Sequence, residues 1–289
     1  EKRKDELNDT AGLYDAHYFA HACGRPYQRD KEWLRFFGAI ADRIVSDIHP
    51  GTVLDAGCAM GFLVEALRDR GVDSYGVDIS EYAIQNVRPD IKPYCSVGKV
   101  TAPLPQQYDL IVCIEVLEHL PQSESERAVE NMCQYTDDVL FSSTPFDYKE
   151  ATHFNVQPPE YWGELFAQAG FFRDVDFDAS FITPWAVRFR RGRDPLHRTV
   201  REYERKFWLL WKENADLRHL VLEMREQLVA DQEAIARTQE AIAEARAERS
   251  VEVARLQDLV AGYEQGRFIR FMRCLSECQL KLREIFKSA

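Results

Sequence analysis

Long apolar stretches, paired cysteines and an excess of positive charge are all missing from this sequence of 289 residues. No apolar run approaches the ~18 residues that a membrane-spanning helix needs. The seven cysteines have no paired spacing and no secretory leader precedes them, so we expect a reducing, cytoplasmic setting without a disulfide framework. The formal net charge of -11 argues against a general nucleic-acid binder, and we expect no DNA partner.

The composition suits one α/β domain of medium size with an additional segment, since 45% of the residues are hydrophobic and 29% are charged. The periodicity predicts helices at residues 31–47, 61–70, 80–88, 123–134 and 158–169. Short apolar runs predict strands at residues 52–56, 74–77, 94–98, 108–114, 139–143, 172–178 and 182–190. This alternation predicts a mostly parallel sheet with helices on both faces. Before the first helix, the segment 11–30 is rich in aromatic residues, which suits either a segment lying over a pocket or a plain surface cap.

Glycine and proline are absent between residues 200 and 261, where a seven-residue repeat runs in one register over eight heptads. Its first core position holds Phe207, Asn214, Val221, Leu228, Ile235, Ile242, Arg249, Leu256 and Tyr263. Its second core position holds Leu210, Leu217, Met224, Asp231, Thr238, Ala245, Glu252 and Leu259. The repeat predicts a coiled coil that joins copies of the chain into a homo-oligomer, with the polar core residues weakening the contact. The alternative is a long helix that folds back onto its own domain.

The C-terminal stretch reads as a basic amphipathic helix. Its basic residues are Arg267, Arg270, Arg273, Lys281, Arg283 and Lys287. Such a helix can lie on the acidic inner face of a membrane, or it can pack back onto the preceding helix. We therefore divide the chain into a cap segment with a helix (1–39), an α/β domain (40–192), a linker (193–199), a coiled coil (200–265) and a C-terminal amphipathic helix (266–289).

The chain is organised around a glycine turn at residues 53–61, where an apolar strand ends in Asp55 and a helix follows Gly61. A dinucleotide site needs G-x-G-x-x-G and no anion facing the phosphates, and neither condition is met. A carboxylate at Asp55 instead suits a cation, such as the ammonium of S-adenosylmethionine. Asp78 ends the second predicted strand and can accept both ribose hydroxyls.

Residues 40–190 resemble the class I S-adenosylmethionine-dependent methyltransferases. The matching segments are 53–61, 76–80, 108–112, 115–120, 160–162 and 169–171. The resemblance implies a Rossmann-like seven-stranded sheet whose last strand is antiparallel, with Asp55, Gly57 and Gly61 at the methionine end of the cofactor and Asp78 at the ribose. The predicted cofactor site also includes Cys58, Ile79, Val100, Glu115 and Tyr27. The sequence departs from the family at Ala59, where many members have a third glycine, and at Lys99, where an acid is common.

The reacting groups are predicted in the turn Glu115-x-x-Glu118-His119, at the end of the fourth strand, where ligands bind in open α/β sheets. Side chains at this spacing share one face of a helical turn. With His153 as a fourth ligand, Glu115, Glu118 and His119 suit Mg²⁺ or Mn²⁺. This set resembles the terminal-ribose methyltransferases of small RNAs and the quinone O-methyltransferases, where a metal could chelate two adjacent hydroxyls. In the alternative, no metal binds, Glu115 faces the cofactor, and His119 packs or acts alone as the base. We predict catalytic roles for His119 and Glu118.

The expected acceptor follows from the domain organisation. A methyltransferase domain followed by a coiled coil resembles bacterial enzymes that modify cell-surface glycans, in which a rod can hold the catalytic head near a membrane-bound polysaccharide assembly. We therefore expect transfer to a sugar hydroxyl of a glycan. The alternatives are a quinone-like small molecule, the terminal ribose of an RNA, and a non-catalytic scaffold that only caps the rod.

Overall fold

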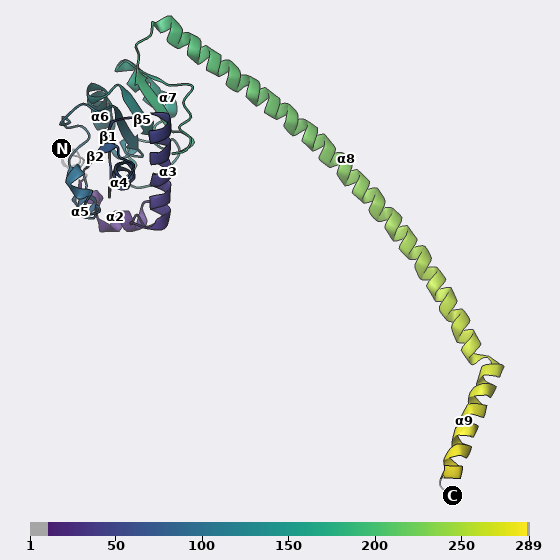
Figure 1. The fold of residues 1–289 in the computed structure, drawn as a ribbon. Helices are drawn as coiled ribbons and strands as arrows, with labels where there is room; N and C mark the ends of the chain where they lie inside the picture. Colours follow the sequence, from purple (N-terminus) through teal and green to yellow (C-terminus); the bar gives the residue numbers. More distant parts are fainter. Residues whose placement is uncertain (1–10, 288–289) are drawn as a thin grey trace. The chain divides into compact units, whose positions relative to one another are not determined.

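The computed structural model describes residues 11–287 (Figure 1). It forms two units, Glu1–Trp208 and Leu209–Ala289. The strands of the first unit are β1 (Thr52–Ala56), β2 (Asp73–Asp78), β3 (Cys95–Val97), β4 (Leu110–Ile114), β5 (Asp138–Ser142), β6 (Phe171–Arg173) and β7 (Val187–Arg191). Its helices are α2 (Ala16–His21), α3 (Lys31–Asp47), α4 (Phe62–Arg68), α5 (Glu81–Gln85), α6 (Gln122–Tyr135) and α7 (Pro159–Gln168), with 3-10 turns η1 (Ala11–Leu13), η2 (Lys92–Tyr94) and η3 (Leu117–His119).

The seven strands form one sheet in the order β3-β2-β1-β4-β5-β7-β6. Strands β1 to β5 pair in parallel, and β7 runs antiparallel to both of its neighbours, β5 and β6. This arrangement confirms the predicted seven-stranded sheet with an antiparallel last strand. The strand order reverses between β1 and β4, and ligands bind at such a point, beyond the carboxyl ends of the strands.

Alternate residues of the central strands face two separate hydrophobic cores. Leu54 and Ile111 pack with α6 and α7 on one face of the sheet. Val53 and Leu110 pack with α3 and α4 on the other face. Both faces are therefore covered, which explains why β4 is an unbroken apolar run in the sequence.

The last two strands are shorter than the sequence suggests, because residues 174–186 form turns instead of extending β6 and β7. The aspartates of this segment capture nearby backbone amides: Asp176 N–H donates to Asp174 Oδ1, and Ser180 N–H donates to Asp178 Oδ1. Side-chain bonds of this kind compete with a sheet ladder. The segment still contributes Ile182 to the core, which is the source of its strand-like apolar pattern.

Two long helices follow the sheet, α8 (Leu196–Gln265) and α9 (Arg267–Lys287). Because α8 begins at Leu196, most of the stretch 193–199 that we expected to be a linker is helical. The first turns of α8 contact β6, where the Tyr203 hydroxyl accepts from Arg173 N–H at 3.0 Å. None of the residues of α8 is buried. Within residues 11–287, no helix is both long enough and apolar enough to cross a membrane.

Candidate active site

The turn between β1 and α4 needs glycine at position 57. Gly57 has φ +89, and a Cβ there would lie 2.3 Å from Cγ2 of Val116. Its N–H donates to Val77 O at 2.8 Å, so the turn is bound to the end of β2. A side chain at this position would push apart the two loops that frame the site.

Asp78 is held at the end of β2 by two backbone amides. Ala59 N–H donates to its Oδ2 at 2.7 Å and Ser80 N–H to its Oδ1 at 2.8 Å. Burial raises the pKa of Asp78 despite these bonds. Ala59, where many family members have glycine, has φ 45, a left-handed conformation that glycine adopts more easily.

Asp55 ends β1 with only 6% of its surface exposed. Burial, and secondarily the charge of Asp78, raise the pKa of Asp55 to about 8. A cationic ligand group beside this carboxyl would favour its ionised form.

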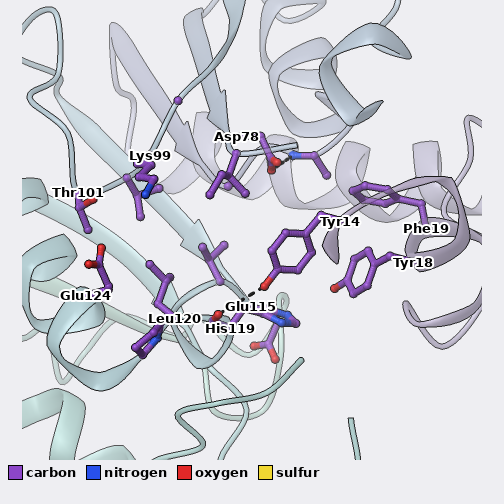
Figure 2. A pocket seen from close by; sticks show the side chains of 17 residues that line it. Tyr14, Tyr18, Phe19, Asp78, Lys99, Thr101, Glu115, His119, Leu120 and Glu124 are labelled. Carbon is purple, nitrogen blue, oxygen red and sulfur yellow. Dashed lines mark hydrogen bonds between the residues drawn. The ribbon is translucent and has the colours of Figure 1, made fainter. Parts of the chain in front are cut away.

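A pocket with about 910 Å³ of empty space, part of it open to solvent, lies over this edge of the sheet (Figure 2). Six of the predicted site residues line it: Gly57, Asp78, Ile79, Val100, Glu115 and His119. Six others do not: Asp55, Cys58, Gly61, Tyr27, Glu118 and His153. Lys99, where the family often has an acid, also lines the pocket, together with Gly98 and Thr101.

The predicted residues outside the pocket wall support it from behind. Cys58 is buried, and a Cβ on Gly76 would lie 2.6 Å from its Sγ, so its side chain fills the space beneath the turn. Gly61 is the left-handed N-cap of α4. Tyr27 stacks on Phe62 with ring centroids 5.0 Å apart.

The N-terminal segment supplies three pocket residues that we did not include in the predicted site: Tyr14, Tyr18 and Phe19. Tyr14, just before α2, and Tyr18, on α2, point toward His119, whereas Phe19 stacks on Tyr82 with ring centroids 5.8 Å apart (Figure 2). The Tyr14 ring lies edge-on to the His119 ring at 5.8 Å. Arg29, in the same segment, forms an ion pair with buried Glu65 at 2.7 Å. The aromatic pattern of residues 11–30 was the signal for this cover, but the sequence alone did not separate a pocket cover from a surface cap.

Glu115 enters the pocket from a strained backbone position at the end of β4. It has φ 52, unusual for a residue with a side chain. Its N–H donates to Ser142 O at 3.0 Å, and its Oε1 accepts from Trp185 Nε1 at 2.9 Å. Strain of this kind is concentrated at functional sites. Trp185 is 70 positions away in the sequence, so no local pattern could have revealed the contact.

Three of the four predicted metal ligands meet beside the pocket. One ligand atom from each of Glu118, His119 and His153 lies within 4.8 Å of the other two. Glu118 is fully buried, and its Oε1 accepts from Thr144 N–H at 3.3 Å. Its Oε2 is buried without a hydrogen-bond partner. Burial and the nearby Glu115 carboxylate raise the pKa of Glu118 well above its usual range.

Both histidines of this cluster are oriented through Nδ1. His119 Nδ1 lies 3.2 Å from Thr152 O and 3.0 Å from Thr152 Oγ1. His153 Nδ1 lies 2.8 Å from Asp147 O. Because a carbonyl oxygen only accepts, we assign the ring proton to Nδ1 in both, which leaves the lone pair on Nε2. Burial and the charge of His153 lower the pKa of His119 to about 4, so His119 is neutral near pH 7.

The profile of the methyltransferase-domain family matches residues 26–172, about half of the chain. The chain therefore belongs to the methyltransferase-domain family. Among curated proteins it is similar to the ubiquinone biosynthesis O-methyltransferase of Azoarcus sp. (strain BH72), with 34% identity over 118 residues, 38% of this chain and 50% of that protein. The same enzyme of Neisseria meningitidis serogroup C is 29% identical over 122 residues, 38% of this chain and 51% of that protein. The chain thus spans about half the length of the curated relatives it matches.

Solved structures show looser similarity. The magnesium protoporphyrin IX methyltransferase of Synechocystis PCC 6803, with bound S-adenosylhomocysteine, has 19% identity and a TM-score of 0.46, covering 55% of this chain and 83% of that one. An amino pentose methyltransferase of Micromonospora echinaspora has 16% identity and a TM-score of 0.44, covering 57% of this chain and 93% of that one.

Proposed function

We propose that the protein is an S-adenosylmethionine-dependent O-methyltransferase. The observation that carries this proposal is the fixed carboxylate of Asp78 at the mouth of the family's glycine turn, with Glu115 and His119 on the opposite wall of the same pocket. Asp78 would bind the ribose hydroxyls, and Asp55 would stabilise the ammonium of the methionine half. The sulfonium methyl then faces an acceptor hydroxyl near His119, and the pocket holds donor and acceptor in line.

The cluster of Glu118, His119 and His153 fits a divalent cation. Each histidine donates a hydrogen bond from Nδ1 to a main-chain carbonyl, which is how metal-bound imidazoles are usually oriented. Glu118 has a buried carboxylate oxygen without a hydrogen-bond partner. One oxygen and two imidazole nitrogen donors suit a borderline ion such as Mn²⁺ or Fe²⁺ better than Mg²⁺, which prefers oxygen ligands. Such an ion would polarise a bound hydroxyl and lower its pKa. Without it, neutral His119 is the group able to take the hydroxyl proton through Nε2.

Two acceptor classes present the adjacent hydroxyls that this cluster could chelate. A sugar of a surface glycan is favoured by the exposed aromatic rings of Phe146 and Tyr148, 75% and 73% exposed, on the loop that carries His153. A small aromatic diol is favoured by the ubiquinone-pathway relatives, which share about half their length with this chain.

The methyltransferase proposal is tested by calorimetry and by methyl transfer. The full chain should bind S-adenosylmethionine, and Asp78→Ala should weaken binding at least tenfold, because it removes both ribose contacts. His119→Ala should abolish transfer while leaving cofactor affinity within about threefold. Absence of cofactor binding at millimolar concentration would contradict the proposal.

The metal is tested separately, with panels of sugar diols and aromatic diols as acceptors. EDTA should abolish transfer, and added Mn²⁺ should restore it more fully than added Mg²⁺. Glu118→Gln should remove Mn²⁺ binding measured by electron paramagnetic resonance, whereas Glu130→Gln, an exposed position on α6, should not. Activity that is indifferent to EDTA and to Glu118→Gln would reject the ion and leave His119 as the base.

A further inference from the structure

A second cavity lies at the carboxyl edge of the sheet, beside the end of β5 and the start of α7. It holds about 650 Å³ of empty space, part of it open to solvent. Its walls are mostly aromatic, formed by Phe141, Trp162, Trp185, Phe189 and Tyr203. Ser143, Gly163, Glu160 and Arg173 also line it. The lining residues belong to strands and helices that are far apart in the sequence, so no local sequence pattern predicts the cavity.

Two polar groups on this wall are buried without partners. Trp162 is 2% exposed and its Nε1 has no hydrogen-bond partner, and Ser143 is 5% exposed and its Oγ has none. Leaving such groups unpaired is costly, and native proteins rarely do so without a reason. An indole N–H only donates, and a hydroxyl can also donate. The pair therefore suits a ligand with an oxygen that accepts hydrogen bonds.

The cavity adjoins the reacting groups through two shared contacts. Trp185 forms part of its wall and donates through Nε1 to Glu115, which lines the cofactor pocket. Ser143 is followed directly by Thr144, whose N–H donates to the Glu118 carboxylate. A molecule in the cavity would thus lie against Trp185, which supports Glu115, and against Ser143, the neighbour of the residue that supports Glu118.

We infer that this cavity binds the body of the acceptor, and that the acceptor is a small, flat, largely apolar ring carrying a carbonyl-type oxygen opposite its reacting hydroxyls. This inference rests on the proposed function and narrows its acceptor. Aromatic walls stack well on a planar ring, and small-molecule sites have this mixture of apolar lining with a few polar groups. Trp162 and Ser143 hold the ring oxygen, and the hydroxyls at the other end point toward Glu118 and His119.

Gly163 allows the cavity to be filled without disturbing the fold. A Cβ added to this residue of α7 meets no atom within 4 Å. Gly163→Leu should therefore occupy the cavity, and Gly163→Ala is the matched control, because it favours the helix and adds only a methyl group. The probe is protocatechuic aldehyde, with catechol, which lacks the carbonyl, as the comparison compound. Binding is measured by calorimetry on the full chain with S-adenosylhomocysteine present, so that no turnover occurs.

Gly163→Leu should weaken aldehyde binding at least tenfold, and Gly163→Ala should leave it within twofold. Ser143→Ala keeps the shape of the wall, and Trp162→Phe keeps a smaller aromatic ring there. Each removes one donor, so each should weaken aldehyde binding about tenfold and weaken catechol binding clearly less. In turnover, the same variants should raise KM for the aldehyde with little change in kcat.

The outcomes separate this inference from the proposed function. If the aldehyde binds and Gly163→Leu blocks it, but no methyl is transferred, the cavity stands and the proposed activity fails. If wild-type protein methylates sugar diols or the aldehyde and none of the three variants changes binding or KM, the activity stands and the cavity is not the acceptor site. Absence of aldehyde binding to the wild-type protein would also overturn the inference.

Discussion

At the scale of single residues, Asp55, which we propose stabilises the cofactor ammonium, lowers folding stability near neutral pH. The pKa of its carboxyl is raised from 3.8 to about 8, so the folded chain holds the proton more tightly than the unfolded chain. Folding stability therefore decreases as pH rises from about 4 to about 8, and the loss is complete above the folded pKa. A binding site often retains such a cost because the ligand compensates for it.

We predict that Asp55→Asn stabilises the ligand-free protein at pH 8 and not at pH 4. The shift corresponds to a maximum of about 6 kcal/mol, and urea unfolding at both pH values measures it. The same variant should bind S-adenosylmethionine at least tenfold more weakly, because it loses the charge beside the ammonium. Asp216→Asn, at an exposed position on α8, is the control. Equal stability of variant and wild type at pH 8 would show that Asp55 is not buried as an anion.

The backbone conformation of Ala59 also affects folding stability. With φ 45 it adopts a left-handed conformation that costs an L-residue about 1–2 kcal/mol. Glycine would avoid this cost, but it loses more chain entropy on folding, which offsets part of the gain. We predict that Ala59→Gly raises stability by up to about 1 kcal/mol and retains cofactor affinity, because the bond from its N–H to Asp78 involves only backbone. Thermal unfolding checks the first part, and a lowered Tm would contradict it.

The part of the site that could be predicted from sequence is the part that lies within one segment. Gly57 and Asp55 share a single turn, and Asp78 follows the next strand, so their chemistry is visible in order and spacing. Glu118 and His119 were predicted together with distant His153 because all follow strands that end at the same edge. The pairing of Trp185 with Glu115 and the second cavity depend on how the β5, β7 and α7 regions pack, and no local pattern encodes that.

At the scale of elements, the short helix α2 forms one wall of the cofactor pocket. Asp15 is its N-cap and accepts from the N–H groups of His17 and Tyr18 at 2.8 and 3.0 Å. Six residues make a marginal helix, so its cap should decide how well Tyr18 and Phe19 are held over the pocket. We predict that Asp15→Ala weakens cofactor binding three- to tenfold with little change in Tm, measured by calorimetry and thermal unfolding.

Asp15→Ser is the matched control, because serine also caps helices and should preserve cofactor affinity. If both variants weaken binding equally, the aspartate charge matters and the helix cap does not.

The elements that were easiest to predict are those with an unbroken pattern of apolar residues. Examples are the apolar strand β4 and the amphipathic helix α3, which spans Lys31–Asp47 as expected. The shortened β6 and β7 were harder, because the side chains of Asp174 and Asp178 divert the backbone and their apolar neighbours imitate strands.

At the scale of the whole molecule, α8 is a continuous helix of 70 residues without a buried side chain. The apolar residues of the heptad positions are exposed: Phe207 68%, Val221 61%, Leu228 58% and Ile235 57%. An isolated helix gains little from such residues, and helical stability in proteins comes mainly from packing. The sequence therefore predicts the helix itself well. The exposed apolar residues of the heptad core positions form a stripe along it. We propose that a second copy of the chain covers this stripe. Contact of α9 with a membrane-bound assembly stays a prediction.

Self-association through this stripe makes a position-specific prediction. Leu228 lies at a core position of the heptad, and Val229, next to it, lies outside the stripe and is 48% exposed. Leu228→Asp would bury a charge between helices and should shift the full chain from oligomer to monomer in light scattering. Val229→Asp adds the same charge at the next position and should leave the mass of the oligomer unchanged. The two variants carry the same net charge and the same catalytic unit, so they differ only in which side of the helix receives the aspartate. If the wild-type chain is monomeric at micromolar concentration, the stripe is not covered by a second copy. The same conclusion follows if the two variants behave alike.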